Sequence, residues 1–210
     1  MTNRRRVAGE PCWIELGGEA DQQVLDFWAE RLGWTFDANE DVTGYRRAWA
    51  GGEKIAGFGG PPHPCTPRGW RVYVHVENLP ALVETAVRAG AELLRGETPA
   101  GRDGRFAFIR DPYDVVIGLF EPYDDPGTAR PPGLGRVARW SVRVSAPGGF
   151  RAFHTALPYD LIGHVDVTAG NQGWQVSLEA REDEEAIDPA GNVLTLRRNP
   201  PSQQPAIPAI

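Results

Sequence analysis

The stretch that decides the fold is GWRVYVHVE, residues 69–77, because the chain repeats it in outline as GWQVSLEAR at residues 173–181. A second pair of landmarks follows in the same order, DPYDVVIGL at 111–119 and DPAGNVLTL at 188–196. Internal repeats of this kind indicate a chain built from related supersecondary units. The offset between the copies is 173 − 69 = 104 at the first landmark and 188 − 111 = 77 at the second. The second copy is therefore shorter by 104 − 77 = 27 residues between its landmarks.

Hydrophobic periodicity around these landmarks alternates between the spacing of a strand and that of a helix. The first copy predicts two βαβββ modules, with helices at 21–32 and 80–90 and strands at 12–16, 45–49, 54–58, 71–76, 91–94, 105–109 and 115–120. The second copy echoes FWAERL of residues 27–32 as FHTAL at 153–157 and lacks a counterpart of the 80–90 helix. It predicts one further βαβββ unit, so the expected fold class is α+β.

The domain organisation expected from this pattern has a complete first domain and a degenerate second one. Its parts are a flexible N-terminus at 1–10, two paired modules at 11–125, a Pro/Gly-rich linker at 126–136, a truncated domain at 137–199 and a disordered tail at 200–210. The sheet of a lone third unit must be covered by the tail, by the first domain or by another subunit. A homodimer is therefore one possibility.

Composition limits the compartment and the partners. The net charge is −6 and the pI about 5.3, which disfavours a nucleic-acid surface, and Arg4–Arg6 are expected to be a solvated tail. No apolar run is long enough to span a bilayer and no secretory signal is recognisable, so we expect a cytoplasmic protein without membrane contact. Its two cysteines, Cys12 and Cys65, are then expected to be free thiols.

The motifs PCWIEL at 11–16, FWAERLGW at 27–34 and DPYDVVIGLF at 111–120 together resemble the vicinal-oxygen-chelate superfamily. This superfamily includes glyoxalases, bleomycin-resistance proteins and dioxygenases, and the chain resembles most its two-domain bacterial members. The resemblance covers residues 11–122 well and 137–199 weakly. It implies that two βαβββ modules join their sheets around a U-shaped cavity that binds a small molecule.

Metalloenzymes of this superfamily place His, Gln or Glu at four positions of the cavity. The resemblance carries these positions onto 11–13, where only Cys12 could ligate, and onto Gly57, Arg71 and Gly118. Arginine stays protonated and glycine has no side-chain donor, so we expect no metal and no other cofactor. The two glycines are instead expected to leave space for a bulky ligand lying against the sheet.

Strand alternation in residues 71–76 places the valines on one face and Arg71, Tyr73 and His75 on the other. Since Arg71 occupies a cavity position in the family, Tyr73 and His75 should share that cavity. Arginine can hold an anionic or carbonyl-bearing ligand, and histidine and tyrosine can position or move protons. The alternative is a solvent-exposed sheet face without a ligand.

The first strand should direct Trp13 and Glu15 toward the same cavity. Glu15 lies opposite Arg71 and is either a base or one half of a structural ion pair. Trp13, Tyr45 and Trp49 are candidate aromatic walls.

Three further features have unremarkable expected roles. His63 lies in a proline-rich segment that is either a lid or a connector, His154 is expected to be exposed on its helix, and the charge run 182–185 is expected to be a solvated turn.

These residues support more than one class of function. The first is metal-independent acid–base chemistry on a small hydrophobic oxygenated metabolite, for example isomerisation, cyclisation or dehydration in secondary metabolism, with His75, Glu15 and Tyr73 as catalytic residues. The second is a non-catalytic small-molecule binder, such as an antibiotic-sequestering self-resistance protein. The third is a scaffold with a vestigial cavity, which the shortened second copy would suit.

Overall fold

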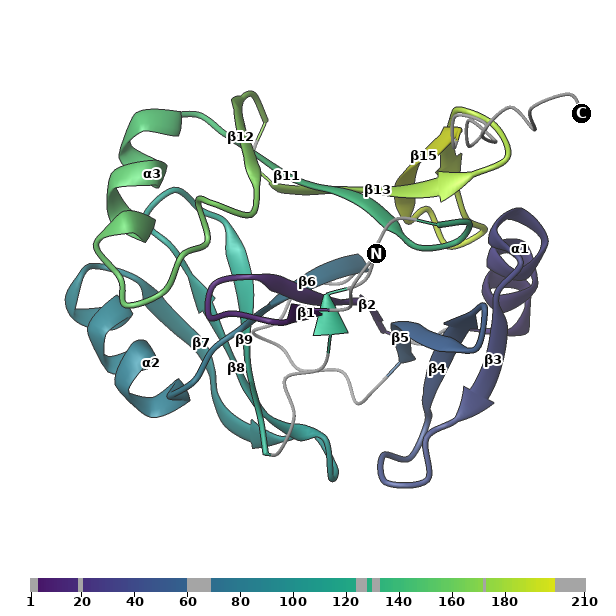
Figure 1. Ribbon diagram of the computed structural model, residues 1–210, viewed down its shortest axis with the longest axis horizontal. Helices are drawn as coiled ribbons and strands as arrows, with labels where there is room; N and C mark the ends of the chain where they lie inside the picture. Colours follow the sequence, from purple (N-terminus) through teal and green to yellow (C-terminus); the bar gives the residue numbers. More distant parts are fainter. Residues whose placement is uncertain are drawn as a thin grey trace, which may run out of the picture.

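The computed structural model describes residues 4–18, 21–59, 69–123, 128–129, 133–171 and 173–198. Within these ranges the chain forms an eight-stranded sheet, a five-stranded sheet and three α-helices (Figure 1). Two short strands, β1 (Arg4–Arg5) and β10 (Thr128–Ala129), pair with each other. The α+β class predicted from the sequence is confirmed. His63, Cys65 and residues 200–210 lie outside the described residues.

The eight-stranded sheet consists of two βαβββ modules joined at their first strands. The modules are β2 (Pro11–Gly17), α1 (Gln22–Leu32), β3 (Thr35–Ala38), β4 (Tyr45–Ala50) and β5 (Glu53–Gly59), then β6 (Gly69–His75), α2 (Leu79–Arg88), β7 (Glu92–Pro99), β8 (Gly104–Arg110) and β9 (Val116–Pro122). The strand order is β3-β4-β5-β2-β6-β9-β8-β7. In the centre β2 and β6 are antiparallel, and each is parallel to the last strand of its own module. The paired modules expected from the sequence are present, with β3 as a strand that the sequence pattern did not reveal.

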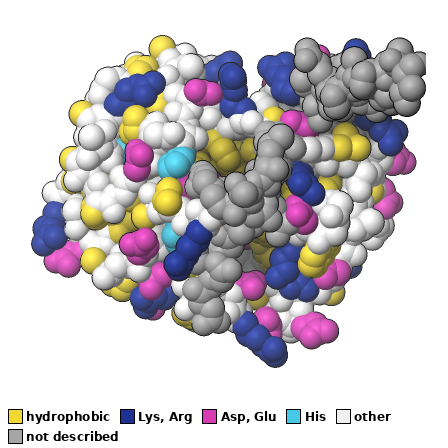
Figure 2. All heavy atoms as spheres, viewed as in Figure 1, with side chains coloured by type: hydrophobic (Ala, Val, Ile, Leu, Met, Phe, Trp, Pro, Cys, Tyr) yellow, Lys and Arg dark blue, Asp and Glu magenta, His cyan; other side chains and the backbone are white. Residues whose placement is uncertain are grey.

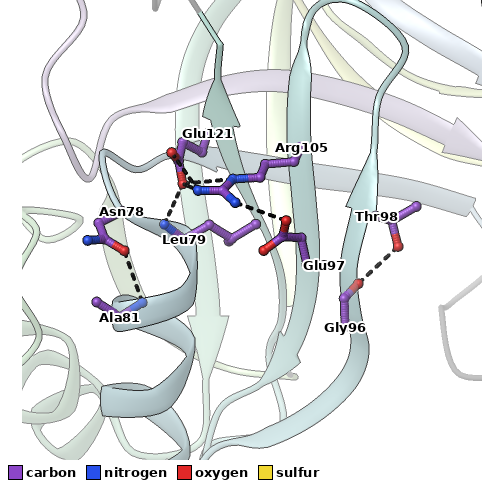
Figure 3. Close-up of polar contacts among 8 residues, drawn as sticks. All are labelled: Asn78, Leu79, Ala81, Gly96, Glu97, Thr98, Arg105 and Glu121. Carbon is purple, nitrogen blue, oxygen red and sulfur yellow. Dashed lines mark hydrogen bonds and ion pairs between the residues drawn. The ribbon is translucent and has the colours of Figure 1, made fainter.

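The bounds of both helices of this domain lie within two residues of the predicted ranges 21–32 and 80–90. The Asp21 side chain caps α1 by accepting a hydrogen bond from the Val24 amide at 2.9 Å, and Gly33 ends the helix with a φ of 67°. Asn78 caps α2 in the same way at Ala81, 3.1 Å away. The amide of Leu79 also donates to Glu121 at the end of β9, at 2.6 Å, which fixes the start of α2 to the sheet (Figure 3).

The five-stranded sheet is formed by the shortened second copy. Its elements are β11 (Val137–Val144), α3 (Pro147–Thr155), β12 (Asp166–Ala169), β13 (Gly173–Ala180), β14 (Glu184–Ile187) and β15 (Val193–Arg198), in the strand order β12-β11-β13-β15-β14. The element order contains the expected β-α-β-β-β together with one additional strand, β14. Because β14 begins at Glu184 and pairs with β15, the expectation that 182–185 is only a solvated turn was wrong for its second half.

Strand pairing shows how the two sheets correspond. The antiparallel β11–β13 pair matches β2–β6, and the parallel pairs β11–β12 and β13–β15 match β2–β5 and β6–β9. The register agrees as well, since Tyr73 lies opposite Gly118 and Ser177 lies opposite Thr195. These pairs have the offsets 104 and 77 seen in the sequence. The five-stranded sheet is therefore the centre of the larger sheet with most of its outer strands removed.

The two sheets pack against each other through their apolar faces, with α1 and α3 at opposite sides of the space between them (Figure 1). One core cluster combines residues of β6, α2, β8 and β9 with residues of β11, α3 and β12. The other combines residues of β2, α1, β4 and β5 with residues of β13, β14 and β15. The first domain therefore covers the sheet that the sequence left without a partner. The opposite face of each sheet points away from this core.

Two equivalent hydrogen bonds join the domains at their helices. Trp28 of α1 donates its Nε1–H to Asp188 before β15, at 3.1 Å, and His154 of α3 lies with Nε2 2.9 Å from Asp111 before β9. The Nδ1 atom of His154 is 2.7 Å from the hydroxyl oxygen of Tyr159. The expectation that His154 is exposed was wrong, because its side chain is fully buried between the domains.

The visible surface carries charges of both signs, interspersed and without a continuous basic stripe over the described residues of that face (Figure 2). None of the helices in the described ranges has the length and apolar character that crossing a membrane requires.

Candidate functional site

A polar cluster lies on the outer face of the eight-stranded sheet, across its central strands. Ile14 and Leu16 of β2 are buried in the helix-covered core, so alternation directs Trp13 and Glu15 to the outer face, as the sequence predicted. Trp13 lies opposite Tyr73 and Glu15 lies opposite Arg71 in the β2–β6 register.

Glu15 and Arg71 form a buried ion pair in the middle of this cluster. Arg71 Nη1 donates to Glu15 Oε1 at 3.1 Å, and both residues are only 8% exposed. Gly17 makes room for the guanidinium, because a β-carbon at that position would collide with Arg71. A buried pair of opposite charges is held firmly, since removal of either partner leaves an uncompensated charge.

Two tyrosines complete the surroundings of the carboxylate. The hydroxyl groups of Tyr73 and Tyr45 hydrogen-bond to Glu15, and Trp13 Nε1 donates to the Tyr45 hydroxyl at 3.1 Å. Burial raises the pKa of Glu15 above its ordinary value, although the Arg71 charge and the two tyrosine hydrogen bonds oppose the rise. Burial also raises the pKa values of Tyr45 and Tyr73 well above 10, so both phenols stay neutral and can donate.

The space expected to remain open at Gly57 and Gly118 is filled by these tyrosines. A β-carbon on Gly57 would collide with the ring and hydroxyl of Tyr45 and lie 3.0 Å from Trp13 Nε1. A β-carbon on Gly118 would lie 2.6 Å from Cδ1 of Tyr73. The glycines thus allow tyrosine rings to lie flat on the sheet, in place of the bulky ligand that the sequence suggested.

Aromatic residues of the second module extend the cluster on one side. Phe106 and Phe108 of β8 pack against Tyr73, with ring centroids 5.8 and 5.2 Å from it. The Arg95 guanidinium lies 4.9 Å from the centre of the Phe106 ring. These residues were not among the site residues predicted from the sequence. The alternation of Phe106 and Phe108 with the core residues Ala107 and Ile109 was the signal that would have found the two phenylalanines.

Two of the predicted site residues lie elsewhere. His75 is four residues beyond Arg71 along β6, about 13 Å at the usual rise of a strand. It lines a separate cavity of about 400 Å³ with Arg5, Arg6 and Glu121. Trp49 belongs to a third group, beside the Arg47–Asp37 ion pair on β3 and β4. The structure therefore brings together Trp13, Glu15, Tyr45, Arg71 and Tyr73, with Tyr45 beside Gly57 and Tyr73 beside Gly118. His75 and Trp49 are not part of this cluster.

Cys12, the one candidate ligand in the first metal position, has its thiol hydrogen-bonded to the protein backbone. Its thiol donates to the backbone oxygen of Tyr73 at 3.4 Å, and burial raises the pKa of the thiol to about 12. A thiol that holds its proton this strongly is a poor metal ligand and a poor nucleophile.

Comparison with known proteins agrees with the fold. Residues 18–120 match the family model described as a glyoxalase-like domain. Among solved structures, the Mn(II)-bound glyoxalase of Novosphingobium aromaticivorans has a TM-score of 0.60 at 10% identity, over 90% of this chain and 82% of that one. The 2,3-dioxygenase LapB of Pseudomonas sp. KL28 has a TM-score of 0.59 at 10% identity, over 96% and 97% of the two chains. Residues 18–120 are therefore similar to a glyoxalase-like domain, and the chain as a whole shares the fold of these glyoxalase and dioxygenase structures.

A closer match in sequence is the mycobacterial protein CFP32, whose description as a glyoxylase is provisional. The chain is 29% identical to CFP32 of Mycobacterium bovis and of Mycobacterium tuberculosis over 169 residues, which is 77% of this chain. It spans 64% of the length of those relatives.

The side chains at this site do not fit the metal that its structural neighbour holds. Within the described parts of the chain, no group of three or more His, Cys, Asp and Glu side chains could hold a metal ion. Glu15 is the carboxylate of the cluster, and the Arg71 guanidinium already occupies the position of a cation beside it. Tyrosine rings cover the two glycine positions.

Proposed function

We propose that this protein is a metal-independent enzyme that acts on a small hydrophobic oxygenated metabolite by acid–base chemistry centred on Glu15. The observation that carries the proposal is the buried Glu15 carboxyl, whose pKa is raised while a guanidinium and two neutral phenols surround it. A carboxyl whose pKa moves toward the working pH is a better proton acceptor and donor.

Each group has a role in the proposed reaction. Glu15 accepts a proton from a carbon next to a carbonyl group, so that the C–H bond breaks and an enolate forms. The fixed charge of Arg71 stabilises the negative oxygen, and the hydroxyls of Tyr45 and Tyr73 are neutral donors to the same oxygen. The proton on Glu15 then returns to another carbon in an isomerisation, or to a leaving hydroxyl group that departs as water in a dehydration. The phenylalanines beside Tyr73 suit the hydrophobic part of such a substrate.

The test is proton exchange at an enolisable carbon. The full chain is incubated in D₂O with 2-hydroxyacetophenone, and the α-proton signal is followed by NMR. The proposal predicts saturable exchange above the buffer rate, reduced about 100-fold or more in Glu15→Gln. His75→Gln is the matched control, because His75 lies outside the cluster, and its rate should equal that of the wild type. Exchange that is equal in wild type and Glu15→Gln would contradict the role of Glu15.

A binding function without catalysis is favoured by one specific observation. The groups around Glu15 are hydrogen-bonded to one another, Trp13 to Tyr45 and both tyrosines to Glu15, as in a network that supports a binding surface. A binder would hold a ligand against the neighbouring aromatic side chains. In the NMR experiment the ligand would then bind saturably, but its α-proton would not exchange faster than in buffer. Sequestration of an antibiotic is the form of this function that the sequence suggested.

A further inference from the structure

The outer face of the five-stranded sheet carries a groove that differs in chemistry from the Glu15 cluster. The groove has a volume of about 980 Å³. The apolar face of this sheet packs on the first domain, so the groove and the Glu15 cluster lie on opposite sides of the molecule. The strand β13 has Gln175 and Glu179 where β6 has Arg71 and His75, so its chemistry differs from that of the first copy.

A comparison of equivalent positions explains why side chains fill the outer face of the eight-stranded sheet, whereas the outer face of the five-stranded sheet is a groove. Register pairs Glu15 with Arg71 in the first sheet and Ser141 with Gln175 in the second. Tyr73 and Gly118 correspond to Ser177 and Thr195. Small hydroxyl and amide side chains thus replace the Glu15–Arg71 ion pair and the Tyr73 ring. The floor of the groove is hydrophilic, which suits a ligand rich in hydrogen-bonding groups and excludes a largely apolar one.

One buried carboxylate lies at the end of this floor, and one of its oxygen atoms has no hydrogen-bond partner in the part of the chain that the structure describes. Glu179 follows Ser177 on the groove face of β13, is 9% exposed and lines the groove. Its Oε2 atom is buried without a hydrogen-bond partner among the described residues. The backbone of Gly135 and Arg136 runs beside it, since Gly135 N donates to Glu179 O and Glu179 N donates to Arg136 O. A buried carboxylate oxygen without a donor is costly, so this position favours a ligand that brings a positive donor.

A positively charged side chain lies next to Glu179 in the register of the sheet. Arg197 of β15 is the register partner of Glu179 in the parallel β13–β15 pair, on the same face of the sheet. No ion pair of Arg197 occurs within the described part of the chain, and the same holds for Arg143 farther along the groove. Glu179 and Arg197 therefore present a carboxylate and a guanidinium side by side, without bonding to each other.

We propose that this groove binds a hydrophilic zwitterion of the amino-acid or short-peptide class. Its ammonium group would bind Glu179 and its carboxylate would bind Arg197, with hydrogen-bonding groups of the ligand over Ser177, Thr195 and Gln175. Charge-assisted hydrogen bonds of both signs then satisfy Glu179 and Arg197 together. The site is independent of the Glu15 chemistry, so either proposal can fail without the other.

The test uses the ¹⁵N-labelled full chain and three probes, with amide shifts as the measurement. L-glutamine carries both charges, N-acetyl-L-glutamine lacks the ammonium group and L-glutamine amide lacks the carboxylate. The proposal predicts saturable shifts on β13 and β15 with L-glutamine. It also predicts binding weaker by about 10-fold or more with either analogue, which corresponds to the loss of one charged hydrogen bond.

Variants connect each charge of the probe to one side chain. Glu179→Gln and Arg197→Gln should each weaken L-glutamine binding about 10-fold or more. Since neither side chain has a side-chain bonding partner among the described residues, both variants should fold. Glu182→Gln and Arg181→Gln are matched controls just outside the groove, and both should bind as the wild type does. Absence of saturable shifts, equal binding of all three probes, or shifts confined to the first domain would each overturn the proposal.

Discussion

Replacing Arg71 by glutamine is expected to raise the pKa of Glu15 further. Burial already raises that pKa, and the Arg71 charge is the largest influence that opposes the rise. Removing the charge leaves the desolvation of the carboxylate without its main compensation. The folded protein should then hold the Glu15 proton to a higher pH.

The size of the effect follows from the geometry of the ion pair. At the N–O distance of 3.1 Å, Coulomb's law with an effective dielectric constant of about 20 gives about 5 kcal/mol, or about four pKa units, as an upper limit. Charge spread over the guanidinium and the hydrogen bonds from Tyr45 and Tyr73 reduces this value. We expect a rise of about one to three units.

The assay is an NMR titration of the chain with ¹³C-labelled glutamate carboxyls, in which Glu15→Gln identifies the Glu15 signal. Arg71→Lys is the conservative control and should keep most of the shift. Arg105→Gln is the positional control, because it breaks the comparable Arg105–Glu121 pair at 3.0 Å far along the sheet (Figure 3). An unchanged or lower Glu15 pKa in folded Arg71→Gln would refute the reasoning, as would an equal rise in Arg105→Gln.

Three further predictions concern packing and pH. Gly118→Ala should lower the free energy of unfolding by about 1–3 kcal/mol, because the new β-carbon meets the Tyr73 ring. The control Gly148→Ala should not lower it, because a β-carbon there meets no atom within 4 Å. Equal denaturation midpoints for the two variants would contradict this. His154→Ala should cost about 2–4 kcal/mol, because it leaves the buried Oδ2 atom of Asp111 and the hydroxyl of Tyr159 without their histidine partner. A loss under about 0.5 kcal/mol would show that these contacts do not hold the domains together. Because folding raises the pKa of Glu15, the folded state binds more protons than the unfolded state at pH values between the two pKa values. The free energy of unfolding should therefore fall as the pH rises through that window, and this fall should be absent in Glu15→Gln. Urea denaturation across that pH range checks the sign.

The fold and the centre of the site were predictable because they depend on local alternation. Polar and apolar side chains alternate strictly along residues 69–77. The structure places Val72 and Val74 in the core between the sheets and Arg71 and Tyr73 on the outer face of the eight-stranded sheet. The repeat landmarks also fixed the register, since Asp111 and Asp188 each accept two backbone amides in the turn before β9 and β15.

The contents of the cavity were not predictable in the same way. Whether Gly57 leaves a void depends on which side chain of β4 lies above it, and alternation gives the face but not the direction of the Tyr45 ring. His75 shares the face of Arg71, yet the distance along the strand and the cover of the N-terminal segment place it in another cavity.

The burial of His154 could have been inferred. Phe150, Phe153, His154 and Leu157 follow the i, i+3, i+4, i+7 spacing of one helix face, and all four are buried. β14 was missed because its alternation of Glu185, Ala186 and Ile187 begins inside a charge run, and a short edge strand has little else to mark it.

The measurement that tests the central claim most directly is a calorimetric titration of Mn(II), the metal of the neighbouring glyoxalase, into the chelator-treated full chain. A site whose cation position is held by Arg71 should show no saturable binding tighter than about 10 μM, and Glu15→Gln should give the same trace as the wild type. Binding of one Mn(II) per chain in the wild type, lost in Glu15→Gln, would show that Glu15 is a metal ligand and would contradict the metal-independent account.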